Sequence, residues 1–206
     1  MNDKIVLLPE RQIDLAKCER LYRFETFDPA DWSITRNPPK WSCEGSRIVG
    51  DVEGRPCHGQ VFYREPVAGD VVLSFYAELL PPCDHDLVWF WNVHLDRDPW
   101  GAGWLGCLGG WWGNLAGIER MPDMDPAAIA AACPITPCRR YHIVSGSAEG
   151  RQFIAVDGQL VVYFPDTERP CDEPGYFGFG VYESCAAYSN LEVYRPRIEP
   201  RVCSYS

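Results

Sequence analysis

The chain has 206 residues, including 18 prolines and 18 glycines, and 13% of its residues are aromatic. This length suits one domain with a substantial core, and the many turn formers and rings predict short strands rather than long helices. The formal net charge of −10 argues against nucleic acid or an anionic membrane surface as a partner, because both would be repelled at long range.

The sequence contains no apolar run long enough to cross a membrane, and its beginning, MNDKIVLLPERQID, lacks the apolar core of a secretion signal. As it stands, the chain is therefore expected to be cytoplasmic; a secreted chain that had lost its leader would look the same. Ten cysteines are many for a cytoplasmic protein. They are scattered, without a C-x-x-C pair, which argues against a zinc site and favours free thiols that pack as small apolar side chains.

One continuous domain is predicted over residues 1–206. Residues 1–45 are expected to form an N-terminal arm and edge strands, because aromatic residues are interrupted there by Asp28-Pro29 and Pro38-Pro39. Residues 46–206 are expected to form the main sandwich. Its first strand candidates are residues 47–52, 60–65 and 71–79, and the last of these shows the clearest alternation of apolar and polar positions.

Residues 87–123 contain six of the eight tryptophans. The first part alternates, which predicts a strand with one face in the core and the other turning polar towards one end. After Asp98 the chain is rich in Gly and Trp, which indicates loops or bent strands that display rings. The apolar row comprises Leu87, Trp89, Trp91, Val93 and Leu95, and the other row Val88, Phe90, Asn92, His94 and Asp96.

A single short helix is predicted over residues 125–132, with Asp125 as N-cap and Pro126 at the first helical position. The β-pattern then returns over residues 140–146, 152–156, 159–164, 177–182 and 188–194, and Asp157-Gly158 forms a two-residue hairpin turn. About ten short strands with little helix predict two packed antiparallel sheets.

The segments RYHIVSGSAEGRQFIAVDGQLVVYFPD and PGYFGFGVYESCAAYSNLEVYRP resemble the C-terminal half of concanavalin-A-like lectin/glucanase sandwiches, including laminin-G-like modules. With Phe27 and Trp32, the similarity spans most of the chain. It is greatest to bacterial members of unassigned function encoded beside pectin- and rhamnogalacturonan-degrading enzymes. The resemblance implies a jelly-roll β-sandwich and, more weakly, a function, because members include glycosidases, polysaccharide lyases and plain sugar binders.

The glucanases of this superfamily carry Glu, Asp and Glu at alternate positions of one strand, whereas this chain has Asn92, His94, Asp96 and Asp98. Hydrolysis by that two-carboxylate arrangement is therefore not supported. A groove on the concave sheet that carries Asn92, His94 and Asp96 would instead suit a His94 base, with Asp96 orienting it.

In this hypothesis Arg97 and Arg120 hold a uronate carboxylate, and Glu119 or Tyr182 supplies the acid, a combination that suits β-elimination on a uronate-containing glycan. Rings beside polar groups suit stacking on pyranose faces. The predicted substrate-binding residues are Trp100, Trp104, Trp111, Trp112, Arg120, Tyr182, His58 and His142.

The expected partner is an oligosaccharide or polysaccharide, and no cofactor is required. Loop carboxylates could supply oxygen ligands for Ca²⁺, although they form no compact loop pattern; these are Asp84, Asp86, Asp96 and Asp98. Glycan cleavage by a lyase or hydrolase is the leading hypothesis. The alternatives are a lectin-like module without catalysis and a structural or partner-binding subunit. In a purely structural reading, His94 and Asp96 merely end a strand and satisfy each other.

Overall fold

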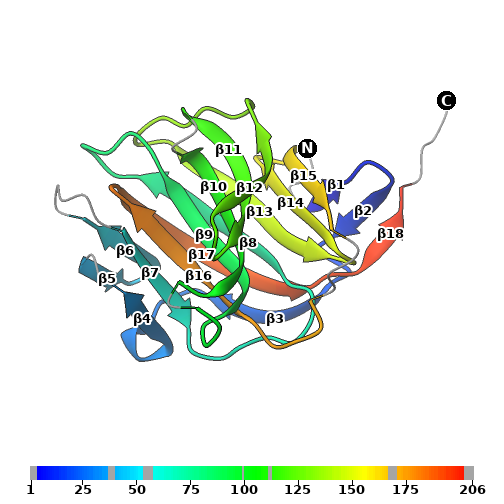
Figure 1. Cartoon of the computed structure of the whole chain (residues 1–206), viewed down its shortest axis with the longest axis horizontal. Coiled ribbons are helices and arrows are strands. Elements are labelled where there is room, and N and C mark those ends of the chain that lie inside the picture. Colours follow the sequence, from blue (N-terminus) through cyan, green and yellow to red (C-terminus); the bar gives the residue numbers. More distant parts are fainter. Residues whose placement is uncertain are drawn as a thin grey trace.

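The computed structural model describes residues 4–36, 40–52, 58–98, 100–110, 113–166 and 171–201. Within these residues the strands form two large antiparallel sheets and a small third sheet (Figure 1). The predicted all-β architecture with two packed sheets is confirmed. No helix of the described chain is long and apolar enough to cross a membrane.

One large sheet has seven strands, which follow one another in space in an order different from that of the sequence. They are β12 (Asp125–Ala130), β11 (Leu115–Met121), β10 (Ala102–Gly110), β9 (Leu87–His94), β16 (Tyr176–Tyr182), β7 (His58–Tyr63) and β4 (Trp32–Arg36).

The other large sheet has eight strands. In spatial order these are β15 (Gln159–Pro165), β14 (Arg151–Val156), β13 (Arg140–Ala148), β8 (Val72–Leu79), β17 (Cys185–Arg195), β6 (Arg47–Asp51) and β5 (Lys40–Glu44), while β3 (Glu19–Phe24) also pairs with β17. The small sheet comprises β1 (Ile5–Leu7), β2 (Arg11–Asp14) and β18 (Ile198–Pro200), on the right in Figure 1. A 3-10 turn, η1, covers Pro29–Asp31.

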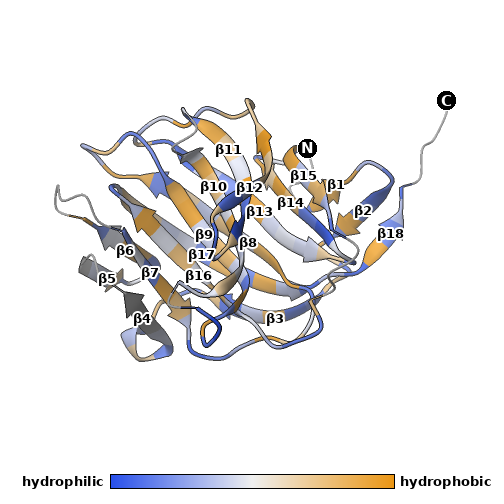
Figure 2. Cartoon of the chain, viewed as in Figure 1, coloured by the Kyte–Doolittle hydropathy of each residue, from blue (hydrophilic) through white to orange (hydrophobic). Residues whose placement is uncertain are grey.

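The main core lies between the two large sheets, and alternation along each strand builds it. Trp89 and Trp91 of β9 are buried there with Phe179 of β16. From the eight-stranded sheet, the ring of Phe75 contacts those of Trp89 and Phe179, and the ring of Tyr188 stacks on that of Phe179. Hydrophobic residues accordingly recur along the strands of both sheets (Figure 2). Burial of such large side chains is the main source of the stability of the sandwich.

The helix predicted over residues 125–132 is wrong, because this segment begins with strand β12 (Asp125–Ala130). Among the described strands, β12 forms the edge of the seven-stranded sheet and pairs only with β11. An edge position tolerates Pro126, and the β11 ladder supplies the backbone hydrogen bonds that so short an isolated helix could not hold. Ala127, Ala128 and Ala130 pack against the main core.

The two predicted rows of β9 are also wrong beyond Trp91. Asn92 has a left-handed backbone, with φ of 50°, and the register with both neighbouring strands shifts around it. These shifts are β-bulges, in which β9 has one more residue than its partner strand. After the bulge, the side chains that would have pointed to one face of the sheet point to the other. Val93 therefore joins Val88 and Phe90 in a separate cluster, instead of following Trp91 into the main core.

The strands within residues 1–45 lie in all three sheets. β1 and β2 belong to the small sheet, and β3 pairs with one end of β17. β4 and β5 form edges of the seven-stranded and eight-stranded sheets. β4 thus covers β7 and β5 covers β6, two strands that would otherwise present unpaired backbone groups.

Candidate functional site

A cavity of about 360 Å³ lies on the face of the seven-stranded sheet that points away from the main core. We call it the outer pocket. Its volume falls in the range that small-molecule sites occupy, roughly 300–1,000 Å³. Strands β7, β16, β9, β10 and β11 contribute its floor through Gln60, Gly180, Val88, Phe90, Leu105, Cys107 and Glu119, and Asp86, Pro122 and Met124 line it from the loops.

Three rings form one wall of the outer pocket. The His58 ring lies between the other two, 4.2 Å from the ring of Trp100 and 5.7 Å from the ring of Tyr182, measured between centroids. His58 and Tyr182 are paired residues of β7 and β16, so the strand register places them side by side. Trp100 is held by a turn in which its backbone N–H donates to Asp98 Oδ1 at 2.8 Å.

Glycines keep the floor beneath this wall open. Phenylalanine and glycine alternate along β16. Phe177 and Phe179 point into the main core, and Gly178 and Gly180 lie on the other face. A Cβ on Gly180 would lie 2.8 Å from the ring of Phe90. Glycine at this position therefore lets the Phe90 ring pack closely against the backbone of β16.

Two carboxyl groups lie at the floor of the outer pocket. Asp86 is 2% exposed and Glu119 is 3% exposed. The thiol of Cys107 donates to Asp86 Oδ1 at 3.3 Å, and Glu119 lies one row further along the sheet, paired with Leu105. Ser184 donates to the backbone oxygen of Asp86 at 2.9 Å, which fixes the residue from the opposite side.

Burial controls the ionisation of this cluster. It raises the pKa of Asp86 to about 6, and the hydrogen bond from Cys107 offsets only part of this effect. Burial also raises the pKa of the Cys107 thiol well above its usual range, and the nearby carboxyls of Asp86 and Glu119 raise it further. The thiol is therefore a hydrogen-bond donor here and not a nucleophile.

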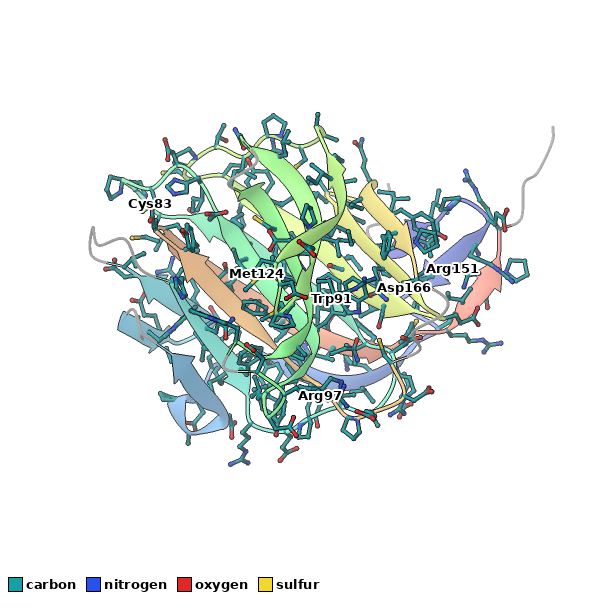
Figure 3. The ribbon with its side chains drawn as sticks, viewed as in Figure 1. Cys83, Trp91, Arg97, Met124, Arg151 and Asp166 are labelled. Atoms are coloured by element: carbon teal, nitrogen blue, oxygen red, sulfur yellow. The ribbon has the colours of Figure 1, made fainter. Side chains whose placement is uncertain are left out.

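A second hollow of about 210 Å³ lies at another place, and it brings together a different group of predicted residues. We call it the His94 hollow. It is lined by Asn92, His94, Arg97, Trp104 and Arg120. Arg97, which lines this hollow, and Met124, which lines the outer pocket, lie well apart in Figure 3.

The polar residues of the His94 hollow already have protein partners. Arg97 forms an ion pair with Glu173, and Arg120 forms one with Asp166 at 2.7 Å. The guanidinium of Arg120 also lies 5.2 Å from the ring centre of Trp104. Both arginines are thus neutralised where the uronate hypothesis needs them to hold a carboxylate.

Asn92 connects the two large sheets. Its Nδ2 donates to the backbone oxygen of Gly69 at 2.8 Å, and its Oδ1 accepts from Ser147 at 2.9 Å. Among the described residues no hydrogen bond joins His94 to Asp96, which is exposed and does not line the hollow. The predicted base and its orienting carboxylate are therefore not coupled in this structure.

The remaining predicted residues are distributed as follows. Glu119, Trp100, Tyr182 and His58 line the outer pocket. His142 lies on β13 of the other sheet, 3.0 Å from the hydroxyl of Ser74. The Trp104 side chain is largely buried in the main core, and Trp111 and Trp112 lie outside the described residues.

Asp86, Gln60 and Cys107 line the outer pocket but were not predicted to contact a ligand there. The sequence indicates Asp86 only as a possible ligand for Ca²⁺. Its position just before an apolar strand could have indicated a carboxyl at a sheet end. No feature of the sequence shows that β10 and β11 place Cys107 and Glu119 near it.

No group of three or more His, Cys, Asp or Glu side chains in the described part of the chain could hold a metal ion. The four carboxylates considered for Ca²⁺ have separate surroundings. Asp84 accepts from His85 at 2.9 Å, Asp98 holds the Trp100 turn, Asp86 lies in the outer pocket and Asp96 is exposed.

No family model and no curated protein sequence matches this chain. Solved structures do match. A protein of unknown function with a galectin-like fold from Bacillus subtilis is similar at 12% identity and a TM-score of 0.68, over 86% of this chain and 96% of that chain. The carbohydrate-binding module CBM66 from Bacillus subtilis is similar at 15% identity and a TM-score of 0.64, over 80% of this chain and 96% of that chain.

The exoplasmic/lumenal domain of VIP36, in its form bound to Ca²⁺ and Man3GlcNAc, is similar at 11% identity and a TM-score of 0.64. This match covers 86% of this chain and 97% of that chain. At such low identity, these similarities show the fold. The chain has a β-sandwich fold of the galectin-like and concanavalin-A-like type, which confirms the predicted jelly roll.

Proposed function

We propose that this protein binds a carbohydrate in the outer pocket. The observation that carries the proposal is the combination of a ring wall, formed by Trp100, His58 and Tyr182, with the buried carboxyls of Asp86 and Glu119 in one cavity. Pyranose rings present apolar C–H faces that pack on aromatic rings, while their hydroxyls require polar partners. An apolar floor with few polar groups supplies both.

The similarity to CBM66 and to the Man3GlcNAc-bound VIP36 domain supports this proposal, since those two proteins are described as binding sugars. VIP36 also binds Ca²⁺. For the present chain the proposed contacts need no metal ion, because side chains of the pocket provide them directly.

Substitution of Tyr182 tests the proposal. Tyr182 is 45% exposed and lines the pocket, so Tyr182→Ala removes part of the ring wall without opening the core. We expect sugar affinity to fall by about tenfold, because an aromatic contact contributes on the order of 1 kcal/mol. A glycan array identifies the ligand, and isothermal titration calorimetry then measures its dissociation constant.

Ile129→Ala is the matched control. Ile129 is also 45% exposed and belongs to the same sheet, but it does not line the pocket. It should leave the affinity unchanged. Equal affinities of wild type and Tyr182→Ala would remove the outer pocket from the function. Failure of every glycan to bind would favour the alternative of a structural or partner-binding subunit.

Glycan cleavage is a second candidate function, and one observation favours it. Asp86 and Glu119 are two buried carboxyls in one pocket, and a pKa of about 6 keeps part of the Asp86 population protonated near neutral pH. General acids of glycosidases have this property. Chromatography of the glycans after incubation with wild-type protein decides between binding alone and cleavage.

The hypothesis of uronate elimination by His94 stays a prediction. It requires Arg97 or Arg120 to exchange its protein carboxylate for that of the substrate, because both arginines form ion pairs in this structure. A genetic setting beside pectin-degrading enzymes likewise stays a prediction. Unsaturated products that absorb in the ultraviolet would support elimination.

A further inference from the structure

We infer that the outer pocket selects a sugar that carries a protonated amine and rejects the corresponding uronate. This inference rests on the proposed function and specifies its ligand class. It reverses the charge expected from the sequence, where paired arginines suggested a uronate.

The charged side chains of the pocket are acidic. Asp86 and Glu119 line it, and no Lys or Arg is found among its described lining residues. Among the described lining residues, the basic side chain is that of His58. Arg120, the neighbour of Glu119 in β11, is directed elsewhere, because it pairs with Asp166.

Asp86 has an oxygen available for a ligand. Oδ1 accepts from Cys107, whereas no described residue donates to Oδ2. The residue lines the cavity although it is 2% exposed, so its charge is separated from bulk water. An ammonium group offers three hydrogen-bond donors and a positive charge, both of which would stabilise this buried carboxylate.

The backbone holds this carboxyl in place before any ligand arrives. Asp86 has φ of 63°, its N–H donates to the backbone oxygen of Gly109 at 3.2 Å, and its own backbone oxygen accepts from Ser184. A carboxyl that is already oriented loses little entropy on binding. In a pocket with an apolar floor the interaction with a cation is stronger than in water, and the repulsion of a uronate is stronger as well.

The test is a matched series of four sugars on one ring: glucose, glucosamine, N-acetylglucosamine and glucuronate, with the galactose series alongside. Dissociation constants are measured at pH 7 by ligand-observed NMR. We expect glucosamine or galactosamine to bind at least about tenfold more tightly than its neutral partners, and the uronate to bind most weakly.

Asp86→Asn is the decisive variant. Asn tolerates the left-handed backbone and can still accept from Cys107, so the pocket keeps its shape. The variant should lose the preference for the amine, so that the amino sugar and its neutral partners bind with similar dissociation constants. Glu119→Gln, made in parallel, should also reduce the preference for the amine. It provides the test if Asp86→Asn does not fold.

The outcomes separate the inference from the function on which it rests. Neutral sugars that bind as tightly as amino sugars would overturn the inference and leave carbohydrate binding intact. An amine preference that survives in both variants would also overturn it, because the charge would then act from elsewhere. Absence of binding by all sugars of both series, with the glycan array also negative, would end the proposed function itself.

Discussion

The buried charge of Asp86 lowers the free energy of unfolding. Its pKa rises from about 3.8 to about 6 on burial, so the folded protein binds a proton more tightly than the unfolded chain does. Stability from this group is present below pH 4 and is lost as the pH rises towards 6. At neutral pH the loss approaches about 3 kcal/mol, because a tenfold change in proton affinity corresponds to about 1.4 kcal/mol.

Asp86→Asn should therefore stabilise the protein at pH 7.5. Asn removes the buried charge and keeps the hydrogen bond from Cys107, so we expect a gain of up to about 3 kcal/mol in the free energy of unfolding. The gain should disappear at pH 4, where the carboxyl of the wild type is protonated. Urea titrations at the two pH values measure it. His85 and Glu183, which also interact with Asp86, stay unchanged.

A gain of the same size at both pH values would show that charge is not its source. If the variant is less stable at pH 7.5, Asp86 must have a stabilising partner. Such a result would also weaken the amine inference, because a satisfied carboxylate has less to gain from an ammonium ligand.

Strand β16 shows how one element serves both the core and the pocket. Its two outward glycines differ in what faces them. A Cβ on Gly178 would collide with the backbone oxygen of Val61, which the β7 ladder holds in place. A Cβ on Gly180 would meet the ring of Phe90, a side chain that can shift.

Gly178→Ala should consequently destabilise the fold by about 3 kcal/mol or more, and Gly180→Ala by about 1 kcal/mol. Gly180→Ala should also weaken sugar binding, because the displaced Phe90 ring narrows the pocket. Chemical denaturation of both variants gives the free energies. Equal destabilisation by the two substitutions would contradict this prediction. It would mean that β16 can move away from the backbone of β7 to make room for the Cβ on residue 178.

At the scale of the whole molecule, a buried polar contact ties the two large sheets together. Ser147 of β13 donates to Asn92 of β9, and both side chains are buried. Ser147→Ala should lower the free energy of unfolding by about 1–3 kcal/mol, because it leaves Asn92 Oδ1 without this donor. Thermal and urea unfolding measure the loss.

Ser145→Ala is the matched control, since Ser145 is also fully buried on β13 but donates to the backbone oxygen of Phe153 within its own sheet. It should cost less, because it breaks no contact between the sheets. A greater loss for Ser145→Ala would show that the contact between the sheets contributes little to stability.

Local patterns in the sequence determined most strands and one turn. Alternation identified residues 71–79 and the start of β9, and Asp157-Gly158 forms the predicted hairpin, with both residues at positive φ between Val156 and Gln159. Burial on one face has a period of two along a strand, and hairpin turns need residues that tolerate positive φ, so short stretches of sequence carry both signals.

Tertiary structure decided the rest. β12 is a strand because β11 offers it an edge, and the faces of β9 change at Asn92 because its neighbours shift register there. The pocket depends on the same long-range pairing, which brings Asp86 near Cys107 and Glu119 from three segments. A local pattern records whether a side chain is buried. Which side chains it meets is set by the order of the strands, which is a property of the whole fold.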